Sequence, residues 1–533
     1  MKFSKKILPM VLAMAMVPAM SMPAFADDTN TTTSTVIAPT NNVDLSKHTF
    51  EAYQIFKGDL DGKKLSNITW GEGVDSVRLL KALKELNGTG KFADFSNCEV
   101  AADVVKVVAG FQNKSEEANK FAKLVANYLT STKTTGKTEG VATLPEAGYY
   151  LIKDTTVVSG GVDDALNLSL LKVNAAGDVT VENKTSKTTL IKKVKDVNDS
   201  VGGLTEWQDS ADYDIGDHIP YQLTATLGDL TNYDTYKLVF YDTMENLTLD
   251  PVAEGDDSSH ALTVFVGEKK LDTNDYILEK STDSKSFTVT INDVKILGGV
   301  TGTKVYVNYY AILGDDANIG SKGNPNTSYL EYSNNPNNTG EGGSLGKTPD
   351  DKNIVFTYKV VANKVDEKKT PLKGAAFELL KKDSSKTAPN NYNSVGIIGA
   401  SKNADGTYEQ TDDQKDMTKF EFKGIDDGDY KIVEVVTPKG YNTMAPIEFT
   451  VTAEHDILAD NPQLRNLLGG DIFTGSVEGE NDGAVIGQIV NKSGSLLPST
   501  GGIGTTIFYI VGVVLVLGAG VLLVTKKRMN ADK

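Results

Sequence analysis

A glutamate in a strand-like segment offers the first candidate chemistry in this sequence. Glu434 lies within GDYKIVEVVTPKGY (428–441), where apolar and polar residues alternate, so we expect a strand that holds its carboxyl group among apolar neighbours. Burial favours the protonated form of a carboxyl group. Beside a lysine and an asparagine, such a group can pass protons while the neutral lysine amine attacks the asparagine amide carbon and ammonia leaves. The product would be an isopeptide bond, formed once per chain.

Residues typical of a turnover enzyme are scarce. No spacing supports a zinc cluster or a Cys-His nucleophile, because the four histidines and the single cysteine are far apart in sequence: His48, His218, His260, His455 and Cys98. The segment GTGKFADF (88–95) lacks the GK[ST] of a phosphate loop and does not follow a buried strand. We therefore expect no cofactor, no metal and no turnover of an external substrate.

The bulk composition describes an acidic protein with several cores. A length of 533 residues with 39% hydrophobic residues suggests about three domains. A formal net charge of −17 argues against nucleic acid as a partner, because phosphate binding needs clustered Lys and Arg. A single cysteine excludes an intramolecular disulfide, the usual covalent staple of secreted domains, so another chemistry would have to supply covalent reinforcement.

Both ends of the chain carry targeting features. Lysines followed by an apolar run and a small-x-small pattern predict a signal peptide over 1–26, cut between Ala26 and Asp27. A Thr- and Asn-rich flexible arm is expected over 27–42. Near the other end, the apolar segment 507–525 predicts a transmembrane helix, and the basic segment 526–533 predicts a cytoplasmic tail.

Most of the chain between these ends has the pattern of β-sandwich modules. Short segments rich in β-branched and aromatic residues, such as KVYVNYYAIL and SYLEYS, alternate with Gly, Asn and Asp turns. Changes to polar, lysine-rich or Gly/Asn-rich composition divide the chain. The sequence therefore predicts a mainly β fold with three tandem Ig-like domains at 43–184, 185–350 and 351–492, followed by a stalk over 493–506.

Two segments of the first domain have helical spacing instead. Apolar residues recur three or four positions apart in each of them: Val77, Leu80, Leu83 and Leu86, then Phe121, Leu124, Val125 and Tyr128. We expect helical insertions whose apolar stripes face the core of that domain.

The C-terminal pentapeptide gives the first resemblance to a known family. An LPSTG motif precedes the apolar span and the basic tail, and this order resembles the cell-wall sorting signal of Gram-positive surface proteins: Leu497, Pro498, Ser499, Thr500 and Gly501. Pro498 keeps the peptide extended for a groove, and the small Gly501 leaves room for an enzyme thiol to attack the Thr500 carbonyl. The resemblance implies that a sortase cuts between Thr500 and Gly501 and that the membrane span is temporary.

A second resemblance lies at the end of the first domain. VTVENK (179–184) is similar to the pilin motif of sortase-built pili, in which a Val-x-Val strand leads into a lysine that attacks the thioester of another subunit. The family usually has Tyr-Pro before this lysine, where the present chain has Glu182 and Asn183. The resemblance implies Lys184 as the acceptor, with Lys187 as the alternative.

The segment around Glu434 resembles the E-box of these pilins, a Tyr-x-x-x-Glu strand followed by a Pro-x-Gly-Tyr turn. In such pilin domains the lysine lies on the first strand and the asparagine on the last. The resemblance therefore implies a bond between Lys364 and Asn491 in the third domain, with Glu434 as the proton-transfer group. An ordinary Lys364–Glu434 salt bridge is the alternative.

The middle domain repeats this logic with another set of residues. Its resemblance to the family implies a bond between Lys192 and Asn326, with Asp242 as the proton-transfer carboxylate. Adjacent residues on a strand face opposite ways, so the choice between Lys192 and Lys193 is decisive, and it stays open at this point. Asn324 is a weaker alternative to Asn326.

The first domain has only a partial E-box, Tyr150-x-x-x-Asp154 without the following turn, and we predict no bond there. Together the motifs identify the chain as a member of the major (shaft or backbone) pilins of sortase-assembled pili. That family implies a head-to-tail polymer joined between Thr500 and Lys184 by a class C sortase. It also implies a housekeeping sortase, peptidoglycan, accessory pilins and an unidentified host ligand as partners. A monomeric wall-anchored adhesin and a tip or base pilin are the alternatives.

Overall fold

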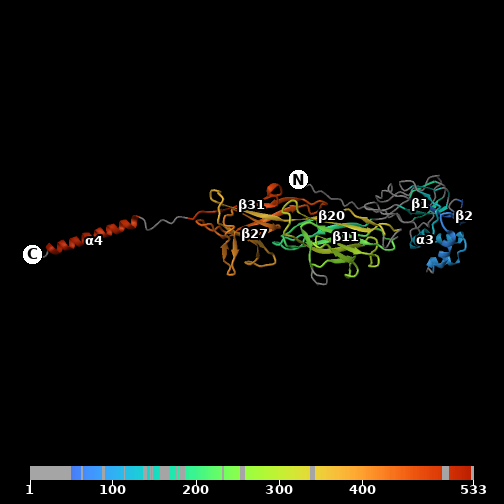
Figure 1. Ribbon diagram of the computed structural model, residues 1–533, viewed down its shortest axis with the longest axis horizontal. Helices are drawn as coiled ribbons and strands as arrows, with labels where there is room; N and C mark the ends of the chain where they lie inside the picture. The colour runs from blue at the N-terminus through green and yellow to red at the C-terminus, as the bar shows by residue number, and fades with distance from the viewer. Residues whose placement is uncertain are drawn as a thin grey trace, which may run out of the picture.

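The computed structural model describes residues 50–529 apart from short internal stretches: 62–63, 87–89, 113–114, 136–140, 145, 147, 156–168, 174–176, 181–186, 231–232, 252–258, 337–342 and 495–502. Its described parts form three β-rich domains in an elongated row, with a long helix beyond the third domain (Figure 1). The predicted signal peptide and flexible arm lie outside the described residues.

The first domain combines one sheet with three α-helices. The sheet has the order β2-β1-β5-β6, with β3 beside β1, and a separate pair joins β4 and β7. The elements are β1 (Phe50–Asp61), β2 (Lys64–Trp70), α1 (Ser76–Glu85), the 3-10 helix η2 (Gly90–Asn97), α2 (Ala101–Val108), α3 (Glu116–Ala126), β3 (Thr134–Thr135), β4 (Val141–Leu144), β5 (Gly148–Asp154), β6 (Ser169–Val173) and β7 (Gly177–Thr180).

The predicted helices are present in this domain, but one predicted stripe was wrong in detail. On α3, Phe121 and Val125 are fully buried, as expected from their spacing. On α1, Val77 is 78% exposed and Leu79 is buried beside Leu83. The Asp75 carboxylate caps α1 by accepting from the Arg78 backbone N–H, which fixes where the helix begins, and Leu79 and Leu83 join the core cluster that also holds Phe95 of η2. The single cysteine, Cys98, is buried in the same core.

The middle domain is a sandwich of two sheets. One sheet has the order β14-β13-β17-β10-β8, with β12 beside β17, and the other has the order β15-β16-β11-β18-β20-β9, with β19 beside β18. The strands are β8 (Thr189–Val194), β9 (Ser210–Asp212), β10 (His218–Thr226), β11 (Leu238–Met244), β12 (Leu247–Leu249), β13 (Thr263–Val266), β14 (Lys269–Lys270), β15 (Ile277–Lys280), β16 (Ser286–Ile291), β17 (Lys304–Leu313), β18 (Asn324–Ser333), β19 (Leu345–Lys347) and β20 (Asp351–Phe356).

Strand β20 corrects the predicted boundary between the middle and third domains. The sequence placed that boundary at 350, because the preceding segment has linker composition. In the structure, β20 pairs with β18 and β9 inside a sheet of the middle domain, with Asn353 opposite Asn326. The middle domain therefore ends at about Phe356, and the first strand of the third domain begins at Tyr358.

The third domain is a smaller sandwich. Its sheets have the orders β26-β21-β31-β30 and β23-β22-β27-β28-β29, with a separate hairpin of β24 and β25. The elements are β21 (Tyr358–Asp366), β22 (Ala376–Lys382), β23 (Tyr392–Ile398), β24 (Ala400–Lys402), β25 (Tyr408–Gln410), β26 (Lys419–Ile425), β27 (Gly428–Val436), β28 (Ile447–His455), β29 (Leu464–Leu468), β30 (Thr474–Ser476), the 3-10 helix η3 (Gly479–Asn481) and β31 (Ala484–Asn491).

The middle and third domains contact each other directly. Lys381 Nζ of the third domain lies 2.8 Å from both Asp199 Oδ2 and Asp214 Oδ2 of the middle domain. The Ile215 backbone N–H donates to the Gly424 carbonyl at 3.0 Å. Gly424 has a φ of 76°, and a Cβ added there would lie 2.4 Å from the Ile215 side chain, so this junction requires glycine.

Helix α4 (Ile503–Met529) follows the third domain and contains the segment predicted to cross the membrane. Its side chains are described only from Tyr509 to Leu523, where they are exposed. Over the side chains that the structure describes, no helix reaches the length and apolarity of a membrane span. The span at 507–525 therefore stays a prediction.

Candidate crosslinking sites

The three side chains predicted to react in the middle domain meet between its two sheets. Lys192 lies on β8 of one sheet, and Asp242 and Asn326 lie on β11 and β18 of the other. All three are almost completely buried, at 0%, 1% and 0% exposure. Side chains alternate between the two faces of each strand, as in the burial of every second residue of β18, and this alternation directs Asn326 into the core.

A tyrosine that sequence reasoning missed connects these three groups. Lys192 Nζ donates to Asp242 Oδ2 and, at 2.8 Å, to the Tyr309 hydroxyl. That hydroxyl donates to Asp242 Oδ2 at 2.8 Å and accepts from Asn326 Nδ2 at 3.0 Å. Asp242 Oδ1 and Asn326 Oδ1 have no hydrogen-bond partner among the described residues. The Tyr309 hydroxyl thus bridges Lys192 and Asn326 by hydrogen bonds to both.

Burial shifts this cluster toward its neutral forms. It lowers the pKa of Lys192, although the nearby Asp242 opposes that shift, and it raises the pKa of Asp242 against the opposing effect of Lys192. The Lys192 amine also lies 5.1 Å from the ring centroid of Tyr221 and 5.5 Å from that of Tyr309. These ring contacts favour the ammonium, whereas burial lowers the pKa of Lys192 toward the uncharged amine, the form that can act as a nucleophile.

The structure also separates the alternatives that the sequence left open. Lys193 faces away from the core and pairs with Asp209 at 2.5 Å. Asn324 is buried, but its Oδ1 accepts from the Asn318 backbone N–H at 2.8 Å and its Nδ2 donates to the Val355 carbonyl at 3.1 Å. Lys192 and Asn326 are therefore the pair that the geometry favours.

In the third domain the predicted lysine and asparagine touch. Lys364 lies on β21 and Asn491 on β31, which are parallel neighbours in one sheet. Lys364 Nζ donates to Asn491 Oδ1 and, at 3.1 Å, to the Ile489 carbonyl. Asn491 Nδ2 donates to Glu434 Oε1 at 2.8 Å and to Oε2 at 3.0 Å, from β27 in the opposite sheet. The amine can reach the amide carbon without rearrangement of the strands.

Glu434 is fixed by its own neighbours. Its Oε2 accepts from the Thr437 hydroxyl at 3.2 Å and from the Met444 backbone N–H at 3.1 Å. Its Oε1 lies 3.7 Å from Lys364 Nζ, a salt-bridge distance between two fully buried side chains. Burial lowers the pKa of Lys364, while Glu434 opposes that shift.

The other predicted site residues are placed less fully. Lys184, the sorting motif at 497–501 and the signal cleavage site at Ala26 and Asp27 lie outside the described residues. Lys187, the alternative acceptor, is exposed shortly before β8. In the first domain, Tyr150 and Asp154 are both buried on β5.

Three groups of described side chains have the spacing of cation ligands: His218, Asp250 and His260; Asp196, Asp212 and His455; and Asp199, Asp214, Asp217 and Asp426. The last group surrounds Lys381, which contacts Asp199, Asp214 and Asp426. The lysine ammonium therefore already supplies the positive charge at the junction between the two domains. The first group has two imidazoles and one carboxylate, the donor set of transition-metal sites.

Comparison with known proteins adds two family matches. Residues 358–462 match the SpaA family, described as a prealbumin-like fold domain, and the match begins where β21 begins. Residues 489–531 match the LPXTG cell wall anchor motif. The fold and this anchor define a class of protein, a cell-wall-anchored surface protein built from β-rich domains.

One curated relative is similar to part of this chain. The chain is 28% identical over 280 residues to the trypsin-resistant surface T6 protein of Streptococcus pyogenes, a match that spans 42% of this chain and 48% of that protein. The family matches and this relative agree with a protein held at the cell-wall surface. The resemblance predicted from the motifs and the predicted surface location are thereby confirmed.

Solved structures of two pilins are also similar to this chain. The T6 backbone pilin of Streptococcus pyogenes is 18% identical, with 86% of this chain and 100% of that chain covered and a TM-score of 0.48. The full-length major pilin SpaD of Corynebacterium diphtheriae is 18% identical, with 84% and 93% covered and a TM-score of 0.42.

Proposed function

We propose that this chain is the shaft subunit of a covalent surface pilus and that two internal isopeptide bonds reinforce it. The observation that carries the proposal is the pair of buried clusters, in which a lysine amine, a carboxyl group and an asparagine amide converge in each of two tandem domains. The anchor match at 489–531 supports attachment to the cell wall. A disulfide cannot supply the reinforcement, because the chain has one cysteine.

In the third domain, the neutral Lys364 amine attacks Cγ of Asn491. Both oxygens of Glu434 accept from Asn491 Nδ2, so a proton held by this carboxyl group can pass to that nitrogen as it leaves, and the carboxylate then takes the proton that the Lys364 nitrogen loses. The Lys364 nitrogen loses its proton as the tetrahedral intermediate collapses. A C–N bond to Nζ forms, the bond to Nδ2 breaks, ammonia leaves, and the carboxyl group returns to its starting state.

In the middle domain, the same exchange joins Lys192 to Asn326 with Asp242 as the carboxyl group. Tyr309 touches all three groups, so its hydroxyl can carry a proton from the Lys192 amine side to the departing amide nitrogen. A proton on Asp242 Oδ1, which has no partner among the described residues, would be free to polarise the amide.

Polymerisation would join Thr500 of one copy of the chain to Lys184 of another. A class C sortase would cut between Thr500 and Gly501 and transfer the Thr500 carbonyl to Lys184 of another copy. Such a heterologous contact, which does not close on itself, generates a filament. A housekeeping sortase would then attach the filament to peptidoglycan, alongside accessory pilins, and the shaft would support adhesion to an unidentified host ligand. The chain acts as a substrate of these enzymes, and its own chemistry is a single turnover.

The test is the covalent ladder that such a polymer gives on a denaturing gel of a cell-wall extract. The parent strain is expected to give a high-mass ladder, and Lys184→Ala is expected to abolish it while Lys187→Ala, the matched control, leaves it intact. A ladder that persists in Lys184→Ala would overturn the acceptor assignment. No ladder in the parent strain would favour the monomeric adhesin.

A further inference from the structure

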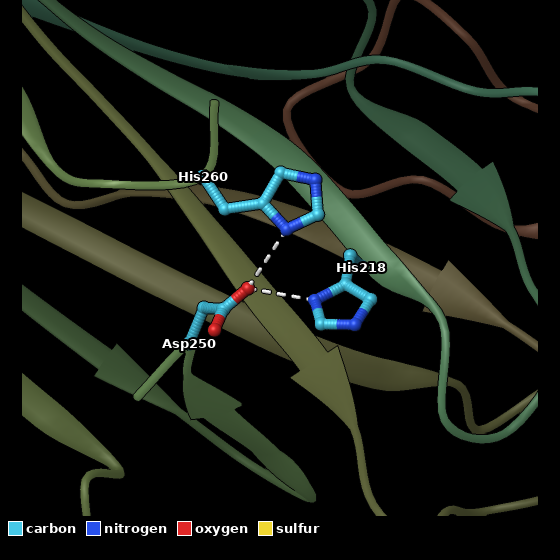
Figure 2. A group of neighbouring side chains, drawn as sticks. All are labelled: His218, Asp250 and His260. Atoms are coloured by element: carbon cyan, nitrogen blue, oxygen red, sulfur yellow. Dashed lines mark hydrogen bonds and ion pairs between the residues drawn. The ribbon is translucent and has the colours of Figure 1, made fainter. Parts of the chain in front are cut away.

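The middle domain brings together two of the four histidines of the chain. His218 begins β10 and His260 precedes β13, so they are distant in sequence, and the predicted absence of a metal rested on that distance. Figure 2 shows both imidazoles turned toward the same oxygen of Asp250. His218 Nδ1 lies 2.6 Å from Asp250 Oδ2, and His260 Nδ1 lies 3.2 Å from the same atom.

We propose that His218, Asp250 and His260 form a binding site for a divalent transition-metal ion of the zinc type. Imidazole nitrogens favour zinc and its neighbours over magnesium or calcium, which prefer oxygen ligands. The three ligand atoms all lie within 4.8 Å of one another. Tetrahedral zinc with bonds of about 2.0–2.2 Å needs ligand atoms about 3.3 Å apart, so small side-chain rotations suffice.

One strand supports all three ligands. His218 is opposite Ile312 in the pairing of β10 with β17. The Asp250 backbone N–H donates to the Tyr310 carbonyl of β17 at 3.0 Å. The His260 ring stacks on the Tyr310 ring with centroids 4.3 Å apart. A site held by a rigid strand loses little conformational freedom when a metal binds.

The exposure of the site suits a metal that enters from solvent. The Asp250 side chain is only 5% exposed, whereas the His260 and His218 side chains are 33% and 46% exposed and are open to solvent. Three protein ligands leave a fourth position for water.

A second histidine site is available as a control. His455 Nδ1 lies 2.7 Å from the Ser210 hydroxyl, and its Nε2 lies 3.6 Å from Asp212 Oδ1. It offers one imidazole, already hydrogen-bonded, at the junction of two domains. His455→Gln therefore removes a histidine near carboxylates without touching the proposed site.

The experiment is calorimetric titration of the full ectodomain with Zn²⁺, repeated with Mg²⁺. We expect one Zn²⁺ per chain, no comparable binding of Mg²⁺, and a higher melting temperature with excess Zn²⁺. Loss of outer-shell partners alone costs about 10–100-fold in metal affinity, so His218→Ala and His260→Ala should each weaken binding by at least about 100-fold. His455→Gln should bind as the parent does.

Two results would overturn the proposal. One is the absence of saturable Zn²⁺ binding by the parent chain. The other is binding that survives in His218→Ala and His260→Ala, or that disappears in His455→Gln. Asp250→Asn provides a further check if an alanine variant fails to fold, because it keeps the side-chain shape and removes the charged ligand. Circular dichroism melts of each variant establish that it is folded before titration.

Discussion

The two candidate crosslinks use the same three functional groups in different places of their sandwiches. In the third domain, Lys364 and Asn491 lie on adjacent parallel strands of one sheet, the first and last strands of that domain. In the middle domain, Lys192 and Asn326 lie in opposite sheets, and β20 still follows the strand that carries Asn326. The earlier expectation that both bonds join first and last strands was therefore wrong for the middle domain.

The position of each covalent bond determines which strands of its domain carry tension when the chain is pulled. The third-domain bond would span nearly the whole domain, so tension entering at β21 leaves through β31 without loading the strands between. The middle-domain bond would leave the rest of β18, β19 and β20 outside the covalent path. Chemistry that is nearly the same would thus protect the two domains to different extents.

The largest expected effect is mechanical. When the chain is pulled from its ends, we expect the third domain to release at most about 20 Å, from the residues between Tyr358 and Lys364. The middle domain should release up to about 110 Å, from the residues between Asn326 and Tyr358, at about 3.4 Å each. Single-molecule force spectroscopy measures these lengths. Release of the full length of the third domain, or of the segment between Lys192 and Asn326, would contradict the proposed bonds.

Stability should also depend on each bond. The third-domain bond closes a segment with a sequence separation of 127 residues, for which the chain-entropy description of covalent links gives about 5 kcal/mol. Asn491→Ala and Asn326→Ala should therefore each lower the free energy of unfolding of their domain by about this amount. Chemical denaturation followed by fluorescence measures the change.

Asn324→Ala is the matched control for that experiment. Asn324 is as buried as Asn326 and lies two residues away on the same strand, but it has ordinary hydrogen bonds only. Its loss should cost about 1–3 kcal/mol. If Asn326→Ala costs no more than Asn324→Ala, the middle-domain bond is absent.

Tyr309 distinguishes the two sites kinetically. In Tyr309→Phe the hydroxyl that links Lys192, Asp242 and Asn326 is gone, and we expect the middle-domain bond to form at least about tenfold more slowly while the third-domain bond forms normally. Mass spectrometry of domain fragments at intervals after synthesis measures both rates. Equal slowing in the two domains would indicate a general folding defect instead of a specific role. Tyr430→Phe, a buried tyrosine of the third domain, serves as the control.

The smallest expected effect is a dependence of stability on pH at the junction between the middle and third domains. Burial, followed by the nearby Asp214 and Asp199, raises the pKa of Asp217 to about 6. A raised folded-state pKa means that the folded junction holds a proton which the unfolded chain releases above about pH 4. The stabilisation is therefore complete below about pH 4 and is lost as the pH rises through 6. Melting temperatures between pH 4 and 8 should fall by a few degrees in the parent and less in Asp217→Asn; an identical slope would contradict this.

Sequence reasoning named most of the side chains that meet in the two clusters, because strand alternation and family motifs constrain Lys364, Glu434, Asn491 and Asp242 strongly. It could not choose between Lys192 and Lys193, since that choice depends on strand register, which the structure supplies through the pairing of Lys192 with Leu223. Tyr309 was missed for the same reason. It is one of two adjacent tyrosines on β17, and register alone decides which one faces the core.

The remaining differences between the predictions and the structure arise from contacts between residues that are distant in sequence. Strand β20 follows a linker-like segment, and only its pairing with β18 and β9 assigns it to the middle domain. The spacing of Val77 fits a helical stripe, but the face of α1 that joins the domain core carries Leu79 instead. His218 and His260 meet only because β10 and the segment before β13 both lie along β17.

The most direct test of the account is the intact mass of the purified ectodomain under denaturing conditions. Each isopeptide bond releases one ammonia, so two bonds make the chain about 34 Da lighter than its unmodified sequence. Glu434→Ala and Asp242→Ala should each be lighter than its own unmodified sequence by only about 17 Da, because the other bond stays in place. A parent mass equal to that of the unmodified sequence would contradict the central claim.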